Sequence, residues 1–309
     1  METLIERTGC PIYYGDFSCI ADKCKKSCCI GWEIDIDSDT LSLYKNMEGG
    51  YSEEIKKSIK TENGTSFFAL GKDERCPHLD DTGLCNIIKE YSDTALCDIC
   101  RLHPRFKNFF TGYTETGLGL SCEEAARIIV NSEEPFHIIA ESLYDESLTD
   151  EEKEIIEIRE DIFTALTYRE LKLSERLTYI CREFGINIKK LNPEKYIDKL
   201  LSLERMDEEW TAILKEAGKN SFSFDILDSE ALEIPFEQLS TYFIFRHFAK
   251  CLEDGDMESK IKFSVFSILF LAFLMNGKED KEKLTEYARI FSSEVEYSEE
   301  NTDKLYKIF

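Results

Sequence analysis

The sequence predicts a mainly α-helical protein, in which a small, loop-rich and cysteine-rich N-terminal region packs on a C-terminal all-helical domain. Ten of the 12 cysteines lie in the first 122 residues, although core-filling cysteines would be scattered along the chain. The later part of the chain instead repeats apolar residues at helical spacing. It also lacks the strand–helix alternation of a nucleotide-binding sheet. We therefore expect a metal-binding region over residues 1–130 and a helical domain over residues 131–309.

The composition excludes several classes of function. The chain has 309 residues, with 62 acidic against 38 basic side chains and a net charge of −24. We do not expect such a chain to bind nucleic acid, because phosphate binding requires an excess of Lys and Arg. The longest apolar stretch, Phe263–Met275, is shorter than the roughly 20 residues of a membrane-spanning helix and predicts a buried core helix. No signal-peptide pattern is found near the N-terminus, so we expect a cytoplasmic protein without a membrane partner.

Short elements can be placed in the first region. Apolar and acidic residues alternate over residues 32–36, which is typical of a half-buried strand. Asp39 or Thr40 can cap a helix that continues through Tyr44. A second helix is expected to start near Ser52, and residues 123–130 form a third.

The second region reads as helical almost throughout. Thr149 and Glu152 form a capping box ahead of apolar residues that share one helix face. Ser174 opens a helix that Gly185 closes, and Pro193 occupies a first helical turn. The remaining predicted helices are Phe236–Leu252, Lys260–Met275 and Lys281–Ser292.

The cysteines of the first region form clusters with the spacing of metal ligands. Cytosolic thiols stay reduced, and dense cysteines there more often bind metal than form disulfides, which would require export by an unusual route. Short loops between paired cysteines let neighbouring sulfurs reach one centre. We interpret Cys181 and Cys251 as core thiols on helix faces. The clustered residues are Cys19-x4-Cys24-x3-Cys28-Cys29, Cys76 with Cys85, Cys97-x2-Cys100, and the single Cys122.

These nine candidate ligands exceed the four or so that an all-thiolate zinc site or a four-iron cluster requires. The surplus permits two centres, or one centre surrounded by structural thiols. His78 and His103 could each replace a thiolate, although a hydrogen bond to a cluster sulfur or a backbone carbonyl is the favoured interpretation. Arg101 and Arg105 either offset the negative charge of the centre or serve solubility.

Familiar cofactor motifs are missing from the sequence. The Cys-x3-Cys-x2-Cys pattern of radical S-adenosylmethionine enzymes is not met, because Cys29 directly follows Cys28. No G-x-G-x-x-G or Walker-type loop is found either.

Several longer motifs surround the clustered cysteines, and one lies in the helical half. They are Phe17-x-Cys19-x4-Cys24-x3-Cys28-Cys29-x-Gly31-Trp32, Cys76-Pro77-x-Leu79, Leu84-Cys85, Cys100-x2-His103-Pro104-Arg105, Leu120-Ser121-Cys122 and Tyr242-Phe243-Ile244-x-Arg246. Together these motifs resemble the flagellin lysine-N-methylase (FliB) family. The resemblance covers the cysteine region well and the helical half only in its general character. It implies a 4Fe–4S protein whose ligands come from the eight cysteines that fit the family pattern, with Cys10 and Cys97 as extras. The implied ligands are Cys19, Cys24, Cys28, Cys29, Cys76, Cys85, Cys100 and Cys122.

The resemblance further implies a lysine N-methyltransferase that acts on flagellin with S-adenosylmethionine as methyl donor. Two alternatives stay open from the residues alone, namely a non-enzymatic zinc- or iron-chelating or electron-transfer module and a structural zinc protein. Nothing in the sequence assigns a catalytic base or the binding site of the methyl donor.

Overall fold

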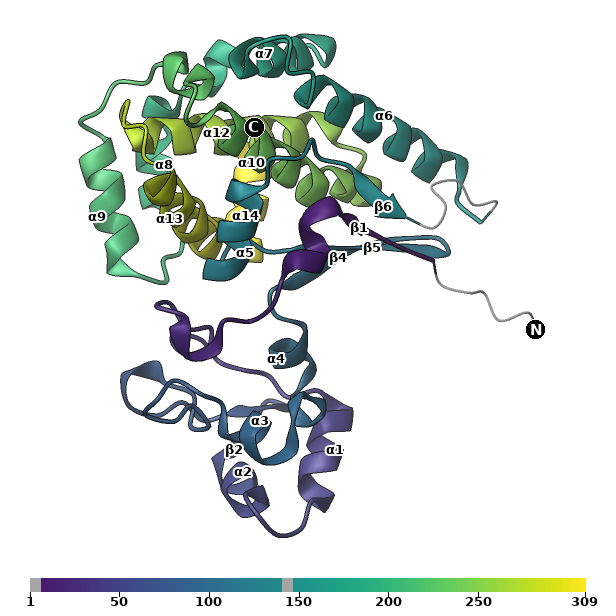
Figure 1. Ribbon diagram of the computed structural model, residues 1–309, viewed down its shortest axis with the longest axis vertical. Coiled ribbons are helices and arrows are strands. Elements are labelled where there is room, and N and C mark those ends of the chain that lie inside the picture. The colour runs from purple at the N-terminus through teal and green to yellow at the C-terminus, as the bar shows by residue number, and fades with distance from the viewer. Residues whose placement is uncertain (1–6, 141–146) are drawn as a thin grey trace. The chain divides into compact units, whose positions relative to one another are not determined.

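The computed structural model describes residues 7–140 and 147–309, and the chain packs as two compact units (Figure 1). The cysteine unit consists of residues 18–106 and 122–124, and the helical unit contains the rest of the described chain. Segments 7–17 and 107–121 therefore pack with the helices rather than with the cysteines, unlike the division at residue 130 that the sequence suggested. The fold is mainly α-helical, as predicted.

A four-stranded sheet in the helical unit was not predicted. Its strand order is β4-β5-β1-β6, with β1 parallel to β5 and antiparallel to β6. The parallel pair joins the start of the chain to residues more than 100 positions later, a long-range contact that no local pattern announces. The strands are β1 (Arg7–Pro11), β4 (Arg105–Phe110), β5 (Tyr113–Leu118) and β6 (Ile138–Ala140).

The helices of this unit pack around α10 (Glu233–His247) and α12 (Met257–Met275) (Figure 1). The side chains of these two helices are buried on almost every side. Within the described residues, no helix has both the length and the apolar character needed to cross a bilayer. The predicted core helix over Phe263–Met275 is confirmed as part of α12. The α-helices are α5 (Glu123–Asn131), α6 (Asp150–Leu166), α7 (Leu173–Glu183), α8 (Ile197–Leu201), α9 (Glu208–Ala217), α10 (Glu233–His247), α11 (Cys251–Asp254), α12 (Met257–Met275), α13 (Lys281–Phe291) and α14 (Glu299–Ile308).

Capping chemistry sets several of these boundaries. The Thr149–Glu152 capping box is present at the start of α6, as predicted.

The helix predicted over Phe236–Leu252 is interrupted, because a 3₁₀ turn at Phe248–Lys250 separates α10 from α11. A π-helix over Ser292–Glu296 follows α13 and directs Glu296 into the interior. Further 3₁₀ turns of this unit are Ile12–Asp16, Ile188–Leu191, Pro193–Tyr196 and Phe224–Asp228.

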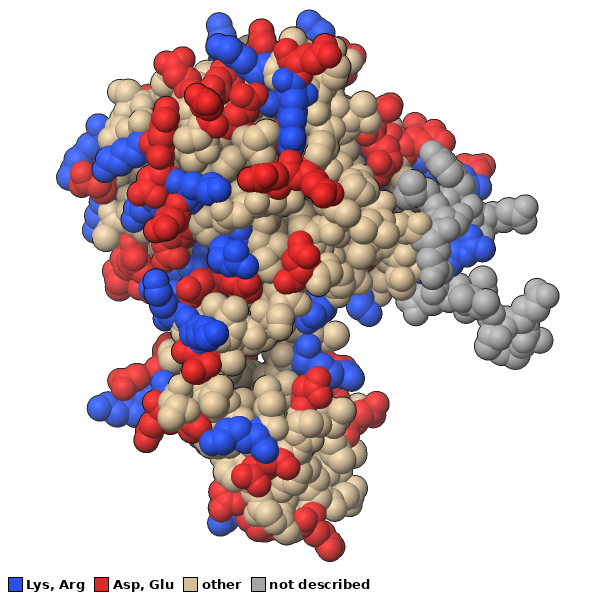
Figure 2. Space-filling view, viewed as in Figure 1, with Lys and Arg blue, Asp and Glu red and all other residues tan. Residues whose placement is uncertain are grey.

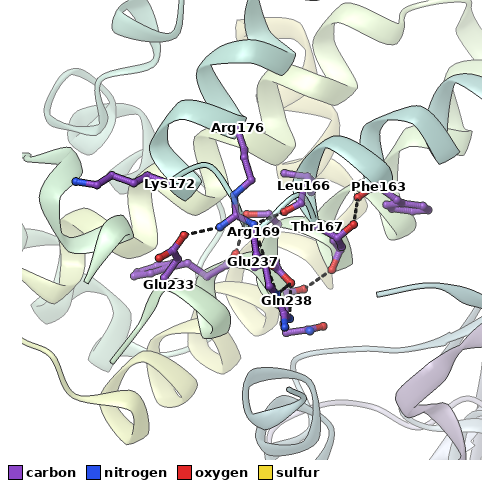
Figure 3. A network of polar contacts seen from close by, with 12 residues as sticks. Phe163, Leu166, Thr167, Arg169, Lys172, Arg176, Glu233, Glu237 and Gln238 are labelled. Carbon is purple, nitrogen blue, oxygen red and sulfur yellow. Dashed lines mark hydrogen bonds and ion pairs between the residues drawn. The ribbon is translucent and has the colours of Figure 1, made fainter. Parts of the chain in front are cut away.

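A network of ion pairs fastens α6, α7 and α10 together (Figure 3). The fully buried carboxylate of Glu237 accepts hydrogen bonds from Arg169, the shortest at 2.7 Å, and from Arg176 at 2.6 Å. Arg176 also pairs with Glu233 at 2.6 Å and donates to the carbonyl oxygen of Leu166 at 2.5 Å. Two arginines thus share one buried carboxylate, which compensates charges that burial would otherwise penalise.

The cysteine unit has a small core of its own. The side chains of Ile34 and Ile36 are buried, as the alternation predicted. Their segment does not form a regular strand, although it exchanges backbone hydrogen bonds with β3 (Ile36 N to Ser66 O, 2.7 Å; Phe68 N to Ile34 O, 3.1 Å). Asp37, rather than Asp39 or Thr40, caps the first helix. The elements are α1 (Ser38–Asn46), α2 (Ser52–Ser58), β2 (Ile59–Glu62), β3 (Thr65–Phe68), α3 (Asn86–Tyr91), α4 (Asp98–Leu102) and 3₁₀ turns at Ala21–Lys23, Lys72–Glu74 and Asp93–Ala95.

Candidate functional site

All nine clustered cysteines lie in the cysteine unit. Packing and mutual electrostatic influence divide them into two groups of neighbours. We call them the buried group and the solvent-facing group. The buried group is Cys29, Cys76, Cys85, Cys97 and Cys100. The solvent-facing group is Cys19, Cys24, Cys28 and Cys122.

The buried group belongs to the hydrophobic core of the unit. Cys97 is fully buried and Cys76 is 7% exposed, and the other three cysteines pack against the same core. Backbone pairing holds the first two segments together, because Cys76 N donates to Cys29 O at 2.8 Å and Gly31 N donates to Glu74 O at 3.0 Å. Two predicted ligands that are far apart in the sequence are thereby held side by side.

Backbone amides donate hydrogen bonds to three sulfurs of the buried group. An N–H group directed at sulfur stabilises thiolate charge, and such bonds tune metal–thiolate centres. The local turns after each cysteine therefore direct amide groups toward the sulfurs, where they partly offset the effect of burial. The amide donors are His78 and Leu79 for Cys76, Ile87 and Ile88 for Cys85, and Cys100 for Cys97.

The protonation of these thiols depends on their pairing. The hydrogen bond between the Cys97 and Cys100 side chains lowers the pKa of Cys97 and raises the pKa of Cys100. Burial raises the pKa of Cys76 to about 12. A bound cation would offset this cost by supplying the positive charge that several buried thiolates require.

The solvent-facing group is organised by Glu123, the first residue of α5. Its carboxylate accepts hydrogen bonds from the amides of Lys25 (2.8 Å) and Lys26 (3.2 Å), and the Cys24 thiol donates to it at 3.6 Å. This clamp holds the loop that carries Cys24 beside Cys122. Burial, then the Glu123 charge, raises the pKa of Cys24 to about 11.

The two groups adjoin at Cys28 and Cys29. A hydrogen bond between their side chains raises the pKa of Cys28 and lowers the pKa of Cys29 to about 7. The charge of Arg75 also lowers the pKa of Cys29. Cys28 lies within electrostatic reach of Cys19 and Cys122, whereas Cys29 influences members of the buried group.

The histidines and arginines named from the sequence have other partners. His78 is buried and hydrogen-bonds the hydroxyls of Ser58 (2.9 Å) and Tyr51 (3.2 Å), so both ring nitrogens are occupied. Burial lowers the pKa of His103, which packs near Trp32, to about 4. Arg101 forms an exposed ion pair with Asp98 on its own helix, which favours the solubility interpretation.

In the described part of the chain, no three His, Cys, Asp or Glu side chains stand at the spacing of a finished metal site. The structure therefore does not show a metal-binding region. It does place the nine clustered cysteines in one compact unit. The donor set consists of thiols, which suits zinc and iron–sulfur clusters.

Sequence reasoning undervalued some residues of this unit. Cys97 ranked low because the family pattern lacks it, yet its burial and its Cys-x2-Cys spacing place it in the buried group. Arg75 and Glu123 were not singled out, although each lies one position from a cysteine. Cys10 lies in β1 of the helical unit, and the predicted core thiols Cys181 and Cys251 are buried there.

The helical unit holds a buried polar cluster of its own, built around Glu296. The ring of His247 bridges Glu296 (2.5 Å) and the hydroxyl of Tyr306 (2.7 Å), and Tyr242 donates to Glu296 at 3.0 Å. Arg246 donates to Tyr242 at 3.0 Å and lies 3.3 Å from Glu296. Two members of this cluster, Tyr242 and Arg246, belong to the Tyr242-Phe243-Ile244-x-Arg246 motif that carried the resemblance.

A groove of about 530 Å³ opens along α7 in the same unit, lined by Ser174, Tyr179, Arg182 and Phe224 among others. No cysteine is among its lining residues. The surface charge is mixed, and on the face drawn in Figure 2 acidic and basic side chains alternate.

Comparison with known proteins finds three relatives, each 28% identical over 130 residues, or 39% of this chain. They are the flagellar biosynthetic protein FliU of Salmonella muenchen and the lysine-N-methylases of Salmonella choleraesuis and Salmonella typhimurium. The matched segment spans 75% of FliU but only 32% of each lysine-N-methylase. No family model and no solved structure matches the chain. The comparison confirms the resemblance that the cysteine motifs predicted, and over this segment the chain is similar to the lysine-N-methylases.

Proposed function

We propose that the protein is an iron–sulfur-dependent protein lysine N-methyltransferase that modifies flagellin with S-adenosylmethionine as methyl donor. One observation carries the proposal. The eight cysteines that the resemblance implied as ligands all lie in one compact unit, although they span residues 19 to 122. The names of the similar proteins support lysine methylation and a flagellar substrate.

The chemistry sets clear requirements on the enzyme. The lysine ε-nitrogen must be neutral, so that its lone pair can form a bond to the methyl carbon. The carbon–sulfur bond of the donor then breaks, its electrons return to the sulfonium sulfur, and the methylated ammonium later loses a proton. When bound, a four-iron cluster supplies either a cross-link that holds the fold or an open iron for the methionine end of the donor.

The residues of this chain would act mainly by positioning and by charge. The thiols of the cysteine unit would hold the cluster, with Arg75 and the amide donors offsetting thiolate charge. The excess of acidic residues would attract a lysine-bearing substrate over a distance and speed encounter.

A non-enzymatic metal-binding or electron-transfer module is the second candidate. The limited match favours it, because about two thirds of each lysine-N-methylase lies outside the matched segment. In that case the thiols carry the metal, while the helical unit only docks a partner.

Anaerobic incubation with flagellin and methyl-labelled S-adenosylmethionine separates the two functions. We expect label on flagellin lysines with protein that contains iron and sulfide, and none after the metal has been stripped by a chelator. Cluster-replete protein that transfers no label to its cognate flagellin contradicts the enzyme. A colourless protein that holds only zinc contradicts the cluster.

A further inference from the structure

The two groups of thiols differ in environment as well as in membership. The buried group contains two buried cysteines and three at intermediate exposure, all packed on one core. The solvent-facing group contains two exposed cysteines, Cys19 and Cys28, and two at intermediate exposure. Among these nine thiols, the buried cysteines thus all belong to one group and the exposed cysteines all belong to the other.

We propose that the nine thiols build two adjoining metal centres, one drawn from the buried group and including Cys97, the other held by Cys19, Cys24, Cys28 and Cys122. The nature of the metal rests on the proposed function, whereas the number of centres does not. Each group can supply the roughly four thiolates that a zinc site or a four-iron cluster requires.

Each group has its own source of positive charge, as two separate anionic centres would require. Arg75 lies beside Cys29 of the buried group. The exposed side chains of Lys23, Lys25 and Lys26 flank Cys24 in the solvent-facing group. This local concentration of lysines stands out in a chain of net charge −24.

The environments also assign different roles to the two centres. The buried centre replaces part of a core that is too small for the unit, as structural metals do in small domains. The solvent-facing centre would include the two exposed cysteines, Cys19 and Cys28, so it is the one that a methyl donor or an electron-transfer partner can reach.

Counting metal in serine variants tests the proposal without any methylation assay. Protein is purified anaerobically from iron-supplemented cells, and iron, zinc and sulfide are measured per chain for C122S, C85S and the double variant. We expect each single variant to keep about half of the wild-type metal and the double variant to keep none. C251S, which removes a buried thiol of the helical unit, should keep it all.

The C122S variant is decisive, because a change at the solvent-facing group leaves the core of the unit in place. If C122S loses all metal while its circular dichroism stays native, the nine thiols serve one centre. If it keeps the full metal content, the solvent-facing centre does not exist. A methylation assay can fail in either case without affecting these counts.

Thiol alkylation of the wild-type protein gives a second measurement that needs no variant. During a slow titration with chelator, peptides that carry Cys19, Cys24, Cys28 and Cys122 should become alkylated first. Peptides that carry Cys76, Cys85, Cys97 and Cys100 should follow in a separate step. Simultaneous alkylation of both sets would overturn the proposal.

Discussion

The backbone amide of Cys76 donates a 2.8 Å hydrogen bond to the carbonyl oxygen of Cys29. This bond joins the first cysteine motif to the second, and the neighbouring bond from Gly31 to Glu74 extends the pairing. Cys29 and Cys76 also pack against the same hydrophobic core. The main chain of the cysteine unit thus holds these two cysteines close together, although they are 47 positions apart in the sequence.

Replacement of Cys76 by Ala is expected to release metal and to lower the melting temperature of the cysteine unit, because coordination there substitutes for a large core. Cys28→Ala should also lose metal. Cys251→Ala is the matched control, since Cys251 is buried as well (2% exposed, against 7% for Cys76) but lies in the helical unit. Metal analysis and thermal unfolding followed by circular dichroism check both effects. Stoichiometric iron retained in both the Cys76 and the Cys28 variants would refute their assignment as ligands.

Substitution of Glu123 by Gln should weaken the clamp on the Cys24 loop. The carboxylate accepts two backbone hydrogen bonds, and an uncharged amide oxygen accepts them less strongly, at a cost of about 1 kcal/mol. We expect a chelator to remove metal several-fold faster from the Glu123→Gln variant, as measured by stopped-flow absorbance. Glu48→Gln changes an exposed glutamate of the same unit and should leave the rate unchanged. Equal rates for all three proteins would argue against the clamp.

Local patterns in the sequence predicted the helical part of the fold but missed the sheet. Thr149 and Glu152 act within one turn, so their capping box could be recognised from spacing alone. Strands β1 and β6 span only five and three residues, and they pair across more than 100 positions. Neither their length nor their partners leave a periodic signal. For the same reason, no local pattern connects segment 7–17 with the helical unit.

The candidate site was predictable in composition but not in arrangement. The spacing of the cysteines identified all nine thiols, yet it could not separate Cys28 from Cys29, which are adjacent in sequence and belong to different groups. Cys97 could have been retained from its Cys-x2-Cys spacing with Cys100. Glu296 gave no signal, because only the π-helix turns it toward His247.

The His247–Glu296 pair should make stability fall in mild acid. Burial lowers the pKa of His247 to about 4, against about 6.5 when unfolded, so the folded state binds fewer protons between these values. Its contribution is complete above pH 6.5 and is lost as the pH falls toward 4. Burial alone would raise the pKa of Glu296, but the charge of Arg246 and other contacts outweigh it and lower this pKa to about 2. The lowered pKa of Glu296 extends the loss of stability below about pH 4.5.

Denaturant unfolding at pH 7.5, 6.5, 5.5 and 4.5 measures this dependence. We expect His247→Gln to reduce the free energy of unfolding at pH 7.5. The variant should also lose less of this free energy between pH 6.5 and 4.5 than the wild type does, by on the order of 2 kcal/mol. His137→Gln removes an exposed histidine and should leave the slope unchanged. An unaltered slope in the His247 variant would contradict a neutral, buried imidazole.

The shared carboxylate of Glu237 should contribute much more to stability than the carboxylate of Glu233, although both pair with Arg176 (Figure 3). Glu237 is fully buried and serves Arg169 as well, whereas the Glu233 side chain is 27% exposed.

Glu237→Gln leaves two guanidinium groups sharing a neutral amide, one of them 1% exposed. Breaking a buried pair in this way costs about 3–5 kcal/mol, while the partly solvated pair of Glu233→Gln costs about 1 kcal/mol or less. Chemical denaturation followed by far-ultraviolet circular dichroism reports the unfolding of the helical unit. The free energies of unfolding of the two variants can be compared when their m-values are equal. Similar losses for both would mean that water reaches Arg176 when the helices move, and that burial of Glu237 does not set the strength of the network.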